Sequence, residues 1–186
     1  MPMHAHGASG ASFVGMWALM MVPMMLPSLA PVLARVERPL VVALGYYAVW
    51  TAVGVAVHAV GLVVGPVVPA RPWVSGVVVL VAGGLQFTAW KARALARCRA
   101  VAAAGGGPWS VTAAWRHGLR LGARCVCSCA GPTAVLLALG AMDLRVMGIV
   151  AVAITAERLA RRSLLAARIG GAVAVGAGVV LLSQVG

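Results

Sequence analysis

The sequence predicts an all-α protein, a polytopic transmembrane helix bundle of about six spans in which the first helix is kinked. Two observations predict this class. First, 62% of the 186 residues are hydrophobic and only 10% are charged, whereas about a quarter are charged in soluble domains. Second, the mean hydropathy is +1.00, and several runs approach the roughly 20 apolar residues that cross a bilayer. We therefore expect one transmembrane domain, residues 13–186, after a flexible extracytoplasmic segment, residues 1–12.

Six apolar runs define the expected spans, at residues 13–33, 40–64, 73–90, 118–141, 145–160 and 166–185. The first run ends at the charged residues RVER, and it lacks the basic start and the cleavage site of a signal peptide, so we expect it to be retained. A polar, glycine-rich connector is expected at residues 91–117. Gly131 and Pro132 interrupt the fourth run and the fifth is short, so a five-span bundle is the alternative.

The net charge of +12 is distributed unevenly between the loops. One set of loops carries most of the cationic residues: Arg35, Arg38, Lys91, Arg93, Arg97, Arg99, Arg116, Arg158, Arg161 and Arg162. The other set carries only Arg71 and Arg145. Because basic loops stay on the cytoplasmic side, six spans would place both termini outside. The basic residues form no continuous face, which argues against a nucleic-acid partner.

The first span contains methionines at helical spacing. Met20 and Met24 are four residues apart, as are Met21 and Met25, so each pair lies on one side of a helix. The thioether is a soft ligand that suits Cu(I) and is poor for Zn(II) or Mg(II). Methionine also fills gaps in a core, so packing is the alternative. Prolines at 23, 27 and 31 predict a kink, because each removes a backbone donor.

A second sulfur-rich segment has the sequence RCVCSCAGP, residues 124–132. In a strand, Cys125, Cys127 and Cys129 would all face one way. In a helix, Cys125 and Cys129 share a side and Cys127 points roughly opposite. We predict that the three cysteines bind a soft metal, with Arg124 favouring the thiolate that such metals need. Disulfides are not expected at a reducing cytoplasmic end, and the alternative role is that of small hydrophobic residues.

Four other residues are candidate accessory metal ligands: Met16, His4, His6 and Cys98. Cys98 lies in the basic connector and could bring a fourth thiol to the same site. His4 and His6 occur in the sequence MHAH near the N-terminus, a pattern that could collect copper at the outer surface. His58 lies within the second span, where an ionisable side chain is costly enough to indicate a partner or a role.

These motifs resemble those of the bacterial predicted metal-binding integral membrane proteins, domain-of-unknown-function family 2182, over about residues 13–160. The matching residues of the first two spans are Trp17, Met20, Met21, Pro23, Met24, Met25, Pro27, Ser28, Gly45, Tyr46 and Trp50. Those further along the chain are Gly84, Gln86, Lys91, Cys98, Arg99, Cys125, Cys129, Gly140, Met142, Asp143, Met147, Glu157 and Arg158. Two features depart from the family pattern: Ala94 replaces a frequent cysteine, and the cysteine run lacks a tryptophan. The resemblance implies metal binding and copper handling.

We therefore predict an integral membrane protein that handles Cu(I), as a transporter or a membrane-embedded chaperone. Copper would meet the thioethers at the outer side and leave to the thiolates, which bind it more tightly, at the inner side. The composition, rich in Ala, Val, Gly and Arg, is typical of a GC-rich bacterial genome and predicts a bacterial plasma membrane. The expected partners are the lipid bilayer, the metal ion, and a membrane protein or a second copy of the chain.

The alternative hypothesis is a non-catalytic structural or assembly subunit of a larger membrane complex. Small residues in the last span would permit close contact with a partner helix: Gly170, Gly171, Gly176 and Gly178. Catalysis is not expected, because acid–base work needs converging groups, and Asp143 and Glu157 should lie on opposite sides. Lys91 is expected in a loop, and Glu157 in an interfacial ion-pair cluster with Arg158 and Arg161.

Overall fold

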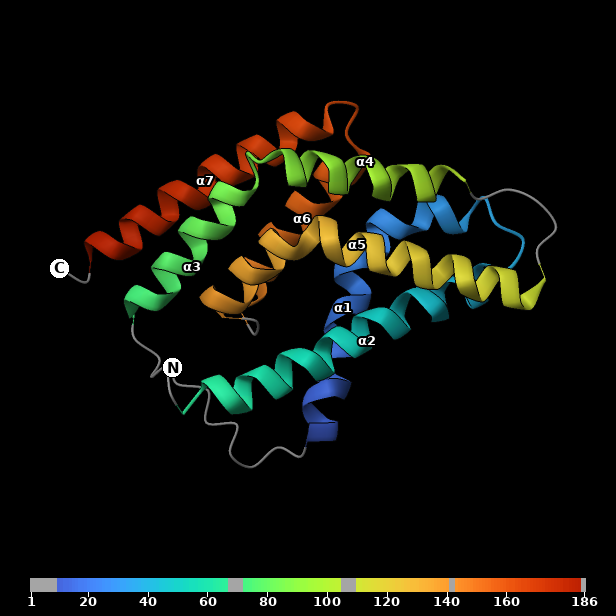
Figure 1. Ribbon diagram of the computed structural model, residues 1–186, viewed down its shortest axis with the longest axis horizontal. Coiled ribbons are helices and arrows are strands. Elements are labelled where there is room, and N and C mark those ends of the chain that lie inside the picture. The colour runs from blue at the N-terminus through green and yellow to red at the C-terminus, as the bar shows by residue number, and fades with distance from the viewer. Residues whose placement is uncertain (1–9, 67–71, 105–109, 141–142, 185–186) are drawn as a thin grey trace.

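The computed structural model describes residues 10–66, 72–104, 110–140 and 143–184, and within these ranges it contains seven α-helices and no strand. The helices are α1 (Gly10–Leu33), α2 (Pro39–Val64), α3 (Pro72–Leu85), α4 (Ala89–Ala103), α5 (Val111–Leu139), α6 (Leu144–Leu159) and α7 (Ser163–Ser183). The predicted all-α class is therefore confirmed. Figure 1 shows α2 beside α5, α3 beside α7, and α1 packed against α2 and α6.

Four helices are long and apolar enough to cross a membrane, namely α1, α2, α5 and α7. A fifth span results if α3 and α4, which are bent by 67° at a short break, count as one. With only 16 residues, α6 is shorter than such a span. The described helices thus give four or five candidate spans, fewer than the six expected, and are compatible with a helical membrane protein.

The expected connector at residues 91–117 is mostly helical, which corrects the prediction. Helix α4 occupies its first part and α5 begins at Val111. Alanine and arginine, which are the commonest residues of this segment, are good helix formers, even though arginine lowers its hydropathy. Both helices also have N-caps, since Thr88 Oγ1 accepts a hydrogen bond from the Lys91 N–H and Ser110 Oγ accepts one from the Ala113 N–H.

Helix α1 continues through Pro23, Pro27 and Pro31 rather than ending at one of them. Figure 1 shows that it changes direction along its length. Side chains bond carbonyls in this region: Tyr47 OH donates to the Val22 carbonyl at 3.2 Å, and Ser28 Oγ donates to the Met25 carbonyl at 2.9 Å. The carbonyls that lose an N–H donor to the three prolines are those four residues earlier, at 19, 23 and 27, so these two bonds are additional contacts rather than replacements.

Glycines allow two helix pairs to approach closely. A Cβ on Gly118 of α5 would collide with the Val42 carbonyl of α2. In the other pair, a Cβ on Gly171 of α7 would meet the Gly83 carbonyl of α3 at 2.9 Å. A Cβ on Gly178 of α7 would likewise meet the backbone of α3. Two of the four glycines that we assigned to a partner protein therefore pack within the chain.

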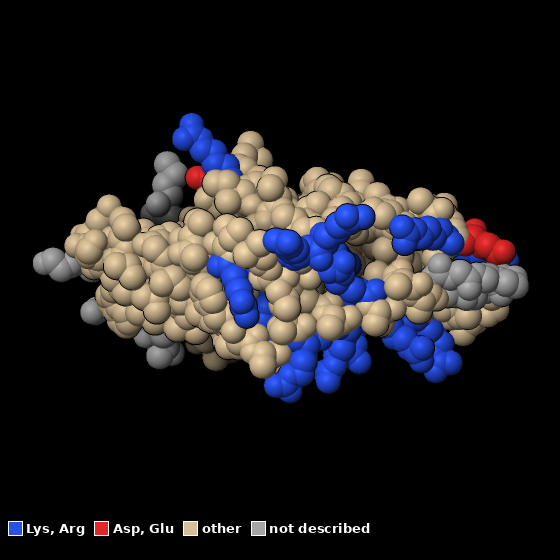
Figure 2. Space-filling model, turned by 90° about the horizontal axis from the view of Figure 1, so that it is seen from above, with Lys and Arg blue, Asp and Glu red and all other residues tan. Residues whose placement is uncertain are grey.

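Cationic side chains gather over one part of the molecule, as Figure 2 shows, whereas the opposite end is almost free of them. The exposed arginines on this part lie in the α1–α2 loop, on α4, on the first half of α5 and between α6 and α7: Arg35, Arg38, Arg93, Arg97, Arg99, Arg116, Arg120, Arg124, Arg161 and Arg162. This separation agrees with the segregation of basic residues noted in the sequence.

Candidate metal centre

Sulfur atoms from three helices share one buried core cluster. Its members include three methionines of α1 and three cysteines of α4 and α5, each no more than 2% exposed: Met21, Met24, Met25, Cys98, Cys125 and Cys129. We call these six residues the sulfur cluster. The structure thus buries five of the seven predicted metal ligands in one core cluster of fifteen residues, together with Cys98, which we had treated as an accessory ligand; the sulfur–sulfur contact within it is that of Cys125 with Cys129.

The other predicted ligands lie at the edge of the sulfur cluster or away from it. Met20 is half-buried and packs against it, Met16 is 45% exposed, and Cys127 is exposed. Of the two arrangements considered for the cysteines, the structure has the helical one, in which a two-residue step turns Cys127 away from its neighbours. His4 and His6 lie outside the described residues. His58 stacks on Phe13, with 4.9 Å between the ring centroids.

Cys125 and Cys129 form the closest pair of thiols, with 3.6 Å between their Sγ atoms. They are one helical turn apart on the buried face of α5. A metal bonded to two sulfurs at about 2.3 Å, the length of a zinc–thiolate bond, separates them by about 4.0 Å at a trigonal angle. A shift of a few tenths of an ångström would therefore let this pair hold a soft metal ion between them.

Arg158 of α6 extends into the sulfur cluster and is only 7% exposed. Its Nη1 donates to Ser28 Oγ at 2.8 Å, to Cys125 Sγ at 3.3 Å and to Tyr46 OH at 3.4 Å, and its Nη2 donates to Cys98 Sγ at 3.5 Å. One guanidinium thus connects α1, α2, α4 and α5. The prediction of an interfacial ion-pair cluster with Arg161 is wrong, because Arg158 is buried while Arg161 is exposed.

Next to Arg158, a buried ion pair joins α4 and α6. Lys91 Nζ lies 2.6 Å from Glu157 Oε2, and both side chains are 2% exposed. Lys91 also donates to the Ser128 carbonyl at 2.6 Å, and Gln86 Nε2 donates to Glu157 Oε1 at 2.7 Å. Lys91 is therefore a buried helix residue, not the loop residue we expected. The sequence does contain an indication that Lys91 is buried and paired, because an ionisable residue inside an apolar protein indicates a role or a partner.

Aromatic side chains of α1 and α2 complete the wall around the thiols. Tyr46 OH donates to Cys125 Sγ at 3.0 Å, and Trp17 Nε1 donates to the Trp50 carbonyl at 2.9 Å. Trp50 Nε1 is buried and makes no hydrogen bond of ordinary geometry among the described residues, although it interacts with the thiol of Cys125. An indole N–H beside the cysteine pair fits a site that holds a metal-bound thiolate, because this group can donate to an anionic sulfur.

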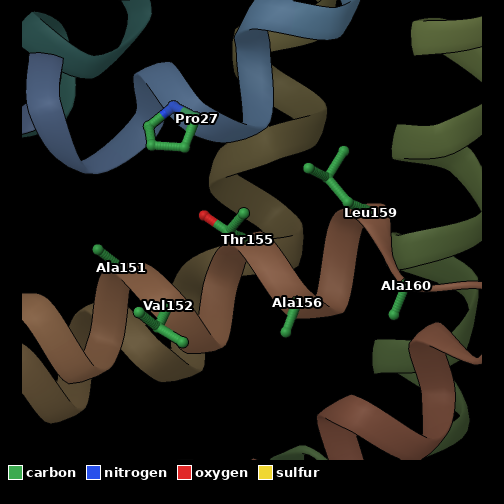
Figure 3. Close-up of a pocket in the computed structure, with 7 residues that line it drawn as sticks. All are labelled: Pro27, Ala151, Val152, Thr155, Ala156, Leu159 and Ala160. Atoms are coloured by element: carbon green, nitrogen blue, oxygen red, sulfur yellow. The ribbon is translucent and has the colours of Figure 1, made fainter.

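An apolar groove of about 550 Å³ lies between α1 and α6. Figure 3 shows Pro27 of α1 facing a row of α6 side chains, of which Thr155 alone carries a polar atom: Ala151, Val152, Thr155, Ala156, Leu159 and Ala160. The groove offers no thiol, thioether or imidazole. This groove is therefore not a candidate site for a soft metal ion.

The donor set determines which metal would fit. In the described part of the chain, no three His, Cys, Asp or Glu side chains form a group that could hold a metal ion. This holds for Cys98, Cys125 and Cys129 too, so these three thiols do not by themselves form such a group. Thiols and thioethers are the ligands that Cu(I) prefers, and the sulfur cluster contains both.

Fold and site together define a helical protein of membrane type with a buried, soft-donor cluster. The chain belongs to the PpoB2 family of copper chaperones, whose family model matches residues 14–181. This match supports the copper-related character that the resemblance implied, whereas the label of family 2182 stays a resemblance. Neither the comparison with curated proteins nor that with solved structures found a match.

Proposed function

We propose that this protein is a membrane-embedded Cu(I) chaperone of a bacterial plasma membrane, and that copper is its cargo. One observation carries the proposal: thioethers of α1 and thiols of α4 and α5, up to about 100 residues apart in the chain, are buried in the same sulfur cluster. Methionines that only filled gaps would not need to converge on cysteines.

The proposed cargo site is the pair Cys125 and Cys129, with Cys98, Met24 and Met25 buried in the same core cluster. When the pair binds Cu(I), two thiol protons leave, and two thiolates with one monovalent ion carry a net charge of −1. Arg158 is the cation that balances this charge, since its Nη1 already lies 3.3 Å from Cys125 Sγ. A buried charge that is paired and hydrogen-bonded is tolerated where an isolated one is not.

A route to this site follows one side of α1. Met16, Met20 and Met24 succeed each other one turn apart, and the exposed fraction falls from 45% at Met16 to 2% at Met24. Thioethers are neutral and release Cu(I) more readily than thiolates do, so a copper ion would move down this series toward tighter ligands. The same property suits a chaperone, which must accept its cargo and release it.

We propose no catalytic activity for this chain. Asp143 caps the first turn of α6 and accepts hydrogen bonds from the Arg145 and Val146 N–H groups. Glu157 lies at the far end of the same helix, paired with Lys91. Helix α6 has 16 residues, which corresponds to about 24 Å, so the two carboxylates do not converge on one substrate.

The test is Cu(I) binding by detergent-purified protein, measured by competition with a chromophoric Cu(I) chelator. We expect about one Cu(I) per chain, and a loss of affinity of about 100-fold or more when Cys125 and Cys129 are both changed to serine. Met16→Leu with Met20→Leu should slow loading without changing the final copper content. Met147→Leu is the matched control, since Met147 packs against the same cluster from α6.

The proposal fails if the Cys125→Ser, Cys129→Ser protein, with an unchanged helical circular dichroism spectrum, binds Cu(I) as tightly as the wild type. X-ray absorption at the copper edge provides an independent readout. We expect sulfur ligands alone, and a spectrum dominated by nitrogen or oxygen ligands would place the ion elsewhere.

A further inference from the structure

Cys127, which the sulfur cluster does not include, lies in a separate pocket on the exposed side of α5. The pocket has a volume of about 90 Å³ and is formed by α4 and α5. Its lining residues are Trp90, Arg93, Ala94, Arg97, Arg124 and Cys127. It therefore places one accessible thiol among three guanidinium groups, with an indole and a methyl group completing the wall.

The three arginines of this pocket lack anionic partners. The only ion pair found within the described ranges is Lys91 with Glu157, and neither residue lines this pocket. No hydrogen bond joins Arg93, Arg97 or Arg124 to another described side chain or carbonyl. Like charges grouped around one hollow repel each other and create a positive potential that an anion relieves.

We propose that this pocket binds a small anionic thiol, one that bears carboxylate groups, and that Cu(I) reaches Cys127 from the sulfur of that carrier. This would be a second entry for copper, on the cation-rich side of the molecule, in addition to the thioether series of α1. The guanidinium groups recognise the carboxylates, which they bind with two parallel hydrogen bonds, while the carrier sulfur approaches the Cys127 thiol. The volume suits one carboxylate-sized group, so the rest of the carrier stays outside. This inference rests on the proposed function, because that function makes Cu(I) the ion that the carrier delivers.

The transfer is an exchange of ligands in which no atom is oxidised or reduced. The bond between copper and one carrier thiolate breaks as a bond between copper and Cys127 Sγ forms. The Cys127 proton moves to the departing carrier thiolate, which leaves as a thiol. Copper remains monovalent throughout, so the step needs no redox partner.

A lipid headgroup is the other anion that could meet these arginines, since basic clusters beside membranes attract anionic lipids. A headgroup would use the guanidinium groups but would leave the thiol in the pocket without a purpose. The pairing of an exposed cysteine with the cationic lining favours the thiol carrier.

Selective alkylation tests the pocket without any copper, because Cys127 is exposed whereas the other three cysteines are buried. We would measure the rate at which detergent-purified protein is modified at Cys127 by iodoacetate, which is anionic, and by iodoacetamide, which is neutral. In the double variant Arg93→Gln, Arg97→Gln the ratio of the two rates should fall about 25-fold, as each guanidinium near an anion in water contributes a factor of about five.

The matched control is the double variant Arg116→Gln, Arg120→Gln, which removes two exposed arginines of α5 that do not line the pocket. S-methylglutathione keeps the two carboxylates of glutathione but has no free thiol, so it does not consume the alkylating agent. It should protect Cys127 in a saturable way in the wild type and in this control, but not in the Arg93→Gln, Arg97→Gln variant. If both double variants lose the iodoacetate preference equally, or if S-methylglutathione gives no protection, the pocket is not a site for anionic thiols. If phosphatidylglycerol protects Cys127 and S-methylglutathione does not, the site belongs to a lipid.

A second measurement separates this inference from the proposed function. Cys127→Ser should load copper from a Cu(I)–glutathione complex about tenfold more slowly, because it keeps the guanidinium groups but has no soft ligand there to accept the ion, and should reach the wild-type copper content. An unchanged loading rate overturns the inference alone. A Cys125→Ser, Cys129→Ser protein that still holds copper overturns the proposed function instead.

Discussion

Replacing Arg158 with glutamine tests whether its charge is what allows a buried copper–thiolate complex. The substitution removes a cation 3.3 Å from Cys125 Sγ and leaves Ser28, Tyr46 and Cys98 without the donor that contacts them. Two opposite charges about 4 Å apart interact by about 4 kcal/mol at an effective dielectric constant of about 20. Allowing for the cost of burying the guanidinium itself, we expect Cu(I) binding to weaken by about 2 to 4 kcal/mol, which is about 30- to 1,000-fold.

The assay is the chelator competition described above, with the unfolding of each variant recorded separately in the same detergent. Lost hydrogen bonds should lower the free energy of unfolding of the Arg158→Gln protein by about 1 to 3 kcal/mol. Arg158→Lys is the control, since it keeps the charge and loses the planar fork, and its affinity should stay within about tenfold of wild type. The reasoning is refuted if folded Arg158→Gln binds Cu(I) normally, or if both variants weaken binding to the same extent.

Three other predictions concern the helices that hold the cluster. Lys91→Met leaves the Glu157 carboxylate buried without its partner and should lower the free energy of unfolding by about 3 to 5 kcal/mol, measured by chemical denaturation in detergent. Gly118→Ala should lower the free energy of unfolding by about 1 to 3 kcal/mol, because the new Cβ meets the α2 backbone. Gly15→Ala is the control: open space surrounds its new methyl group, so it should be neutral or stabilising. Equal effects of the two substitutions would contradict the close approach of α2 and α5. Tyr46→Phe removes one hydrogen bond to the cysteine pair and should cost about 1 kcal/mol of stability, and a stabilised protein in thermal melts would show that this bond is dispensable.

Helical spacing alone led from the sequence to much of the candidate site. The four-residue intervals in the first span and between Cys125 and Cys129 were sufficient to place these residues on common helix faces. The structure buries both cysteines and three of the four methionines, while Met20 is half-buried. Composition was sufficient for the all-α class. At residues 91–117 the composition led to a wrong prediction, because the polar side chains suggested a loop although alanine and arginine favour helix.

The polar contacts of α6 were beyond the reach of the sequence. Glu157 and Arg158 are adjacent, and successive residues of a helix point about 100° apart. The structure directs Glu157 to Lys91 of α4 and Arg158 to the thiols and to Ser28 of α1. A single sequence shows that these side chains differ in direction, but it does not show which helices lie on each side.

The sulfur cluster draws on side chains that span most of the chain, from Met21 in α1 to the guanidinium of Arg158 in α6. During synthesis, the thioethers leave the ribosome long before the arginine that links them to the cysteines has been translated. A nascent chain that stops short of α6 therefore has every sulfur atom of the cluster but lacks the cation between them. Competence to carry copper should accordingly be among the last properties that this polypeptide acquires.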